Sequence, residues 1–198
     1  MRLLYLGLIA SGLTLLHGGP RHNEQTPAAK QVSQHENRIA ADKRAAVLNF
    51  STSTLGWKEK GQNSGPEIER ILDSVGLKGT HSPYCAAWIF FVGRESLGAQ
   101  NPYPRSAWSP DMVRKATWVK GKGREPQPGD VGGLFFPSKG RIAHVFLIEK
   151  NLPNLFVSQE ANTSPDAAPG SAADRDGGGV YRKRRLKSQV HSVRNWID

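Results

Sequence analysis

The chain has 198 residues, a formal net charge of +10 from 27 Lys and Arg against 17 Asp and Glu, and a single Cys. A chain of this length can form one domain with its own core, and its ordinary apolar and charged fractions exclude wholesale disorder, collagen and coiled coil. One Cys excludes an internal disulfide and a Cys-rich zinc site. The positive charge predicts an anionic partner: nucleic acid, a membrane surface or an acidic cell-wall polymer.

An uncharged run of fourteen residues, 3–16, follows Arg2 near the N-terminus. A stable membrane span needs about 20 apolar residues, so this run is too short for one. A charged front before a short apolar core is typical of a secretory signal. We therefore expect residues 1–19 to be a signal peptide, the protein to be exported to the periplasm or the cell exterior, and no membrane span after cleavage. The alternative is an uncleaved hydrophobic helix.

The segment 20–43 is rich in Gln, Asn, His, Glu and Ala and has little apolar periodicity. This composition indicates a polar linker with helical character toward its end. One folded domain, expected to be monomeric, should occupy residues 44–198.

Helical patterns fill the first half of this domain. They cover residues 45–55, 66–76, 82–98 and 109–118, and are bounded mainly by Gly and Ser-Pro pairs. The third pattern is apolar nearly all round, which predicts a buried central helix.

Short β-rich runs separated by Gly, Pro and Asn follow. They cover residues 131–136, 142–149, 155–160, 180–186 and 190–197. Helices followed by strands predict an α+β domain with an antiparallel sheet of about five strands. The Gly- and Asp-rich segment 163–179 should be a surface loop that borders a binding cleft.

The single Cys, Cys85, is the first candidate for chemistry. If Ser82 caps the helix and Pro83 is its first residue, Cys85 lies in the first turn. There the helix dipole and free N–H groups stabilise a thiolate, which is the reactive form of the residue. The alternative is a small buried hydrophobic residue.

His144 lies in a strand that is apolar on both faces, so it is either a core residue or a general base in a dry site. A Cys nucleophile needs an imidazole and a third group that orients it. Glu160 and Asn162 are two residues apart on the next strand, and either could accept the imidazole N–H. The alternative is that they begin a polar loop.

Five motifs occur in order: residues 83–88 (PYCAAW), 128–130 (PGD), 142–145 (IAHV), 160–163 (EANT) and 177–182 (GGGVYR). Together they resemble the cysteine, histidine-dependent amidohydrolase/peptidase (CHAP) family of papain-like cell-wall hydrolases, over residues 48–197. The resemblance implies a papain-like fold and hydrolysis of amide bonds in peptidoglycan, with no cofactor. It also implies Cys85 as nucleophile, His144 as base, and Glu160 with Asn162 as the polar partners that orient His144.

The chain departs from this pattern in places. Tyr84 replaces a common Trp and should keep an aromatic wall, and Ala161 replaces a common Gly. Some relatives bind calcium just before the Cys, but residues 78–82 have no carboxylate, so we expect no metal there. Tyr84 and Trp108 are candidate walls of the substrate groove, although a core role is at least as compatible with each. The position of Trp88 in the middle of the helix favours a core role for this residue.

The run 182–187 holds five basic residues. A nucleic-acid patch is one interpretation, but the alternating pattern favours a solvated edge strand or attraction to anionic wall polymers, and we expect no nucleic-acid partner. The remaining His residues lack metal-site spacing. Asp130, in a Pro-Gly-Asp turn, should be structural.

Two functions are compatible with the sequence. The first is an exported cysteine hydrolase that cleaves amide bonds in peptidoglycan, as an amidase or endopeptidase. The second is a non-catalytic, basic wall-binding module on the same fold. The complete Cys, His, Glu and Asn set favours the first.

Overall fold

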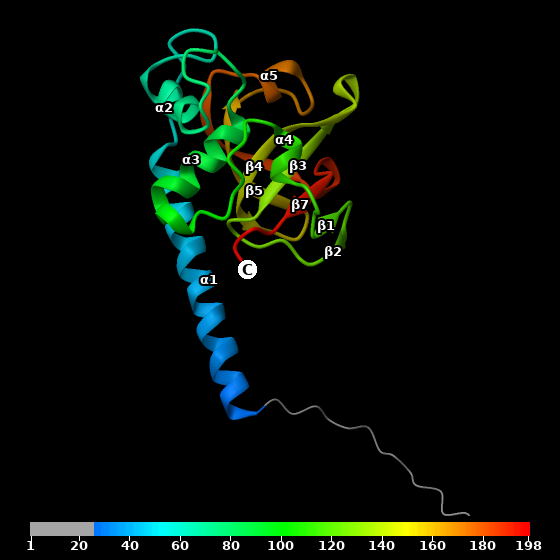
Figure 1. Cartoon of the computed structure of the whole chain (residues 1–198). Helices are drawn as coiled ribbons and strands as arrows, with labels where there is room; N and C mark the ends of the chain where they lie inside the picture. The colour runs from blue at the N-terminus through cyan, green and yellow to red at the C-terminus, as the bar shows by residue number, and fades with distance from the viewer. Residues whose placement is uncertain (1–25) are drawn as a thin grey trace, which may run out of the picture.

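The computed structural model describes residues 26–198, which form an α+β fold in which helices pack on an antiparallel sheet (Figure 1). The α+β class is therefore confirmed. The expected signal peptide, residues 1–19, lies outside the described residues. Within residues 26–198, no helix combines the length and apolarity that crossing a membrane requires.

Five α-helices are present in the described chain. They are α1 (Pro27–Ser53), α2 (Pro66–Ser74), α3 (Cys85–Leu97), α4 (Ser109–Met112) and α5 (Ala172–Arg175), with short 3-10 turns at Gly98–Gln100, Pro137–Lys139 and Lys187–Gln189. Helix α1 begins inside the segment expected to be a linker, because Thr26 caps it and Pro27 occupies its first position. Its buried residues begin only at Arg44, the expected start of the domain.

The fourth helix is shorter than expected. It ends at Met112, and Lys115 adopts a left-handed backbone (φ 52°) that no helix can continue through. Trp118, expected at the end of this helix, lies instead in a strand.

The sheet has seven strands, not about five. They are β1 (Trp118–Val119), β2 (Lys122–Gly123), β3 (Val131–Phe136), β4 (Arg141–Asn151), β5 (Leu155–Thr163), β6 (Gly179–Leu186) and β7 (Ser192–Arg194), in the spatial order β2-β1-β7-β3-β4-β5-β6. The two additional strands have only two residues each, too few for an alternating pattern to show. The five longer strands lie where the sequence predicted them.

Helix α3 packs against α1 and α2 on one side and against β4 and β5 on the other. Its side chains from Cys85 to Ile89 are all buried, as its all-round apolar sequence predicts. The sheet also supports a second cluster of apolar side chains, which includes Trp118, Phe146 and Phe156.

A buried ion pair fastens α1 to the start of β3. Arg44 donates hydrogen bonds to the Asp130 carboxylate at 2.8 Å and to the carbonyl oxygen of Pro128 at 2.6 Å. The other Asp130 oxygen accepts the N–H of Gln127 at 2.9 Å and closes the turn. Asp130 is structural, as expected.

Replacing Arg44 with Met should lower the free energy of unfolding by about 3 kcal/mol, because Asp130 is left buried without its counter-charge. Urea unfolding measures the change. Arg38→Met, on the exposed part of α1, is the matched control and should change stability by less than about 0.5 kcal/mol. Equal losses in the two variants would show that the ion pair does not fasten α1.

Candidate active site

Cys85 is the first residue of α3, with Tyr84 as the N-cap. The sequence had placed the cap at Ser82 and Cys85 two positions further into the helix, which is wrong. The helix starts later because the first intrahelical bond runs from the N–H of Trp88 to the carbonyl of Tyr84, at 2.8 Å. Cys85 remains in the first turn, where the helix dipole favours an anion.

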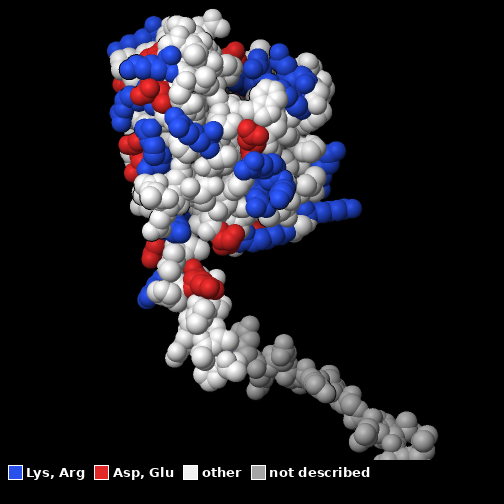
Figure 2. All heavy atoms as spheres, viewed as in Figure 1, with Lys and Arg blue, Asp and Glu red and all other residues white. Residues whose placement is uncertain are grey.

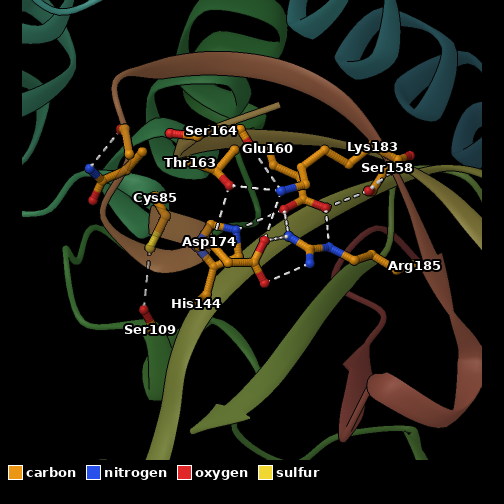
Figure 3. Close-up of polar contacts among 12 residues, drawn as sticks. Cys85, Ser109, His144, Ser158, Glu160, Thr163, Ser164, Asp174, Lys183 and Arg185 are labelled. Atoms are coloured by element: carbon orange, nitrogen blue, oxygen red, sulfur yellow. Dashed lines mark hydrogen bonds and ion pairs between the residues drawn. The ribbon is translucent and has the colours of Figure 1, made fainter. Parts of the chain in front are cut away.

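His144 lies on β4 and Glu160 on the neighbouring β5, and both side chains are fully buried. The imidazole Nε2 is 2.9 Å from a carboxylate oxygen of Glu160. The other ring nitrogen, Nδ1, has no hydrogen-bond partner among the described residues. The thiol of Cys85 is 3.4 Å from the Ser109 hydroxyl, and Figure 3 shows the thiol and the imidazole in one group. The expected Cys, His and Glu residues are therefore together.

The environment favours an ion pair between the sulfur and the imidazole. Burial opposes ionisation of Cys85, but the neighbouring His144 and its charge, helped by Ser109, lower the pKa of the thiol overall. Burial likewise opposes charge on His144, but Cys85 and Glu160 raise its pKa to about 9. Both shifts favour a thiolate beside an imidazolium over the neutral pair.

Glu160 is held as a carboxylate. Burial opposes its charge, but Arg185 and then His144 lower its pKa well below the usual range. Arg185 donates to both Glu160 oxygens, at 2.8 and 2.5 Å, and the Ser158 hydroxyl donates to one of them at 2.5 Å. A fully ionised Glu160 can accept the imidazole N–H and stabilise the imidazolium.

Arg185 also binds a second carboxylate. It donates to both oxygens of Asp174 at 2.7 Å, and Lys183 donates to Asp174 at 2.7 Å (Figure 3). Charges of opposite sign therefore alternate from His144 through Glu160, Arg185 and Asp174 to Lys183. Proton transfer from Cys85 to His144 leaves the total charge of this group unchanged.

Arg185, Lys183 and Asp174 were missed in the sequence. Strand β6 is an edge of the sheet, as the sequence suggested, but Arg185 is 1% exposed and is not solvated. Alternate residues of a strand share a face, and Ser158 lies opposite Lys183 in the β5–β6 pair. The signal available in the sequence was the alternation of Lys183 and Arg185 on β6. These basic residues lie on the strand that pairs with β5, which carries the buried Glu160.

Asn162 does not orient His144. A bulge after Ala161 and a left-handed backbone at Asn162 (φ 58°) direct its side chain elsewhere. The side-chain Oδ1 of Asn162 accepts the backbone N–H of Tyr84 at 3.1 Å, and the side-chain Nδ2 donates to Oδ1 of Asn63 at 2.8 Å. Asn162 therefore fixes the residue that caps α3. The left-handed position is occupied by Asn162 and not by Ala161, so the backbone requires no Gly at Ala161.

The two aromatic residues expected to line the substrate groove lie in different environments. Tyr84 is fully buried and donates its hydroxyl to Glu59 at 3.0 Å, so its assignment to the groove wall is wrong. Burial and the Glu59 charge raise the pKa of Tyr84. Trp108 is half exposed and lines the cavity at Cys85. Trp88 is in the core, as expected, and donates to Thr54 at 3.0 Å.

The cavity beside Cys85 has a volume of about 420 Å³. Its wall comes from the chain before α3, from the segment around Trp108, from β4 and from α5. The expected surface loop thus borders the cavity through Arg175. A larger hollow of about 570 Å³ lies at Trp118, Phe135 and His191 and shares no lining residue with it. Cys85 lines the smaller one.

Among residues 26–198, no group of three or more His, Cys, Asp or Glu side chains is arranged to hold a metal ion. Comparison with protein-family models and with curated proteins found no match for this chain. The chemistry of the site is therefore interpreted from its geometry.

The thiolate of Cys85 should react with iodoacetamide well below pH 8.5, the ordinary pKa of a thiol. His144→Ala should move the midpoint of the rate–pH profile upward, because only burial and weaker hydrogen bonds then act on the sulfur. Mass spectrometry of the intact protein reports Cys85 alone, since the chain has one Cys. His35→Ala, on the exposed part of α1, is the control; the same midpoint in both variants would refute the ion pair.

Arg185→Met should lower the free energy of unfolding by about 3–5 kcal/mol, because Glu160 and Asp174 become buried charges without a partner. Arg184→Met, exposed on the same strand, should change it by less than about 0.5 kcal/mol. Urea unfolding compares the two. If Arg185→Met does not fold, Arg185→Lys, which keeps the charge but loses the fork of donors, should give an intermediate loss. Stability unchanged in both Arg185 variants would contradict the role given to this residue.

Proposed function

We propose that the protein is a cysteine hydrolase that cleaves amide bonds in peptidoglycan, with a papain-like site of the CHAP type. The observation that carries the proposal is the buried Cys85–His144–Glu160 group at the start of α3, opening into a cavity. A thiol with a lowered pKa, beside a base held by a carboxylate, is the arrangement that nucleophilic catalysis needs.

The chemistry follows from these three side chains. The Cys85 sulfur attacks the amide carbonyl carbon, and the carbonyl oxygen becomes an oxyanion beside the backbone N–H of Cys85 at the positive end of α3. The imidazolium of His144 gives its proton to the leaving nitrogen, and the C–N bond breaks. His144 then takes a proton from water as the water oxygen attacks the thioester carbon. The C–S bond breaks, the acid is released, and Cys85 returns to a thiolate beside the imidazolium of His144.

The choice of peptidoglycan rests on the five sequence motifs and on charge. Basic side chains are numerous on the face shown in Figure 2, including the edge where β1 and β2 lie. A formal charge of +10 favours association with an anionic wall and its polymers. The apolar run 3–16 supports export by a signal peptide to the periplasm or cell exterior. We propose that the protein acts there as a monomer.

Purified wild-type protein should release peptides or bridge fragments from peptidoglycan, and Cys85→Ala should reduce the rate by about 10³-fold or more. Mass spectrometry of the products measures the rate and identifies the bond that is cut. His144→Ala should also lower the rate, because it removes the proposed base. His191→Ala leaves the cavity at Cys85 intact and, as the matched control, should keep the rate of wild type.

Equal cleavage by wild type and Cys85→Ala would overturn the assignment of the nucleophile. Binding of wild type to several wall types without cleavage of any would favour the non-catalytic wall-binding module.

A further inference from the structure

We propose that Arg175 and Arg141 form a carboxylate-binding subsite in the cavity beside Cys85. The substrate would then be an acidic peptide, with a free carboxylate near the amide bond that is cut. This inference rests on the proposed function and specifies which amide substrates the site accepts.

The charged side chains that line the cavity at Cys85 are all positive. Two of its lining residues, Arg141 and Arg175, are basic, and no Asp or Glu lines it. The charges of Cys85 and His144 cancel within the site. Arg141 and Arg175 therefore leave the cavity with a net positive charge, which a substrate carboxylate would neutralise.

Arg175 has few partners in the protein. Its side chain is 19% exposed, and the nearest carboxylate, Asp176, is 4.0 Å from it, beyond a hydrogen bond. Among the described residues, no side chain or backbone oxygen accepts a hydrogen bond from its guanidinium. Arg185, equally an arginine of this site, is fully paired with two carboxylates. Arg175 thus keeps its donors for a ligand.

Arg141 is held in position by its neighbours. Its guanidinium carbon lies 3.8 Å from the centre of the Trp108 ring, and Nη1 donates to the carbonyl of Ile142 at 2.9 Å. Stacking on an aromatic face fixes the plane of a guanidinium and leaves the donors along its edge available. A carboxylate is the anion whose two oxygens fit such an edge.

The position of Arg175 is fixed by the residue before it. Asp174 is buried, bound to Arg185 and Lys183, and its N–H donates to the Ser171 hydroxyl that caps α5. Arg185 also holds Glu160, which holds His144. The cation at the cavity wall and the base are therefore tied to the same guanidinium, and this pre-organisation lowers the entropic cost of binding.

The test compares two forms of the same purified peptidoglycan. In one the stem-peptide carboxylates are free, and in the other they are converted to carboxamides with carbodiimide and ammonium ion. Wild type should cleave the free form about tenfold faster at limiting substrate, the value of one charge-assisted hydrogen bond. Arg175→Gln should bring the ratio of the two rates close to one, and Arg141→Gln should reduce it.

Arg184→Gln is the matched control, since it removes the same charge from the exposed face of β6 and should keep the ratio of wild type. The iodoacetamide profile of Cys85 in each variant checks that the nucleophile is intact. Equal rates on both walls for wild type, or equal loss of preference in Arg175→Gln and Arg184→Gln, would overturn the subsite.

Absence of cleavage of either wall by wild type would count against the proposed function alone. The subsite is then decided by sedimentation of Cys85→Ala with the two walls. Arg175→Gln in that background should weaken binding to the free form more than Arg184→Gln does. Equal weakening by the two substitutions would refute the subsite.

Discussion

The guanidinium of Arg185, buried between Glu160 and Asp174, is the interaction on which the site depends. Glu160 lies where water cannot solvate its charge, and an unpaired carboxyl group there would become protonated. A neutral carboxyl would no longer stabilise an imidazolium at His144, and without the imidazolium the thiol of Cys85 would keep its proton. One buried cation on β6 therefore favours, through Glu160 and His144, the ionised form of a sulfur on α3.

A second constraint sets where the sulfur lies. The left-handed backbone at Asn162 takes its side chain off the face that Glu160 occupies and brings it to the N–H of Tyr84. The strand that carries Glu160 thus also fixes the N-cap of the helix that carries Cys85. Because both contacts start from the same end of β5, one short piece of backbone positions both His144 and the first turn of α3.

Local patterns predicted much of this fold. The helical pattern of residues 66–76 predicted α2, and the apolar sequence of residues 82–98 predicted α3. Alternation and turn residues gave the five longer strands. These features depend on which side chains must leave water, and that information is local to each segment.

Features that depend on a distant partner were not predicted. Strand β1 forms beside β7, which is distant in the sequence, and β2 pairs with β1. The bulge that turns Asn162 away from His144 inserts one residue, which an alternating pattern does not reveal. Charge in the sequence showed that β6 is basic, but the burial of Arg185 depends on Glu160 and Asp174, which come from other segments. The sequence singled out Cys85, His144 and Glu160 because their residue types and order are restrictive. It did not single out Arg175 and Arg185, because arginine is common on protein surfaces.

The position of Cys85 has a consequence for oxidation. A thiolate is the form of cysteine that peroxides attack, and the first product, a sulfenic acid, is normally rescued by a neighbouring thiol that forms a disulfide. This chain contains no second cysteine, and the nearly buried Cys85 lines a cavity of about 420 Å³. Reduction therefore requires a small external thiol that enters through this cavity, and anything that fills the cavity shields the sulfur from oxidant and reductant alike.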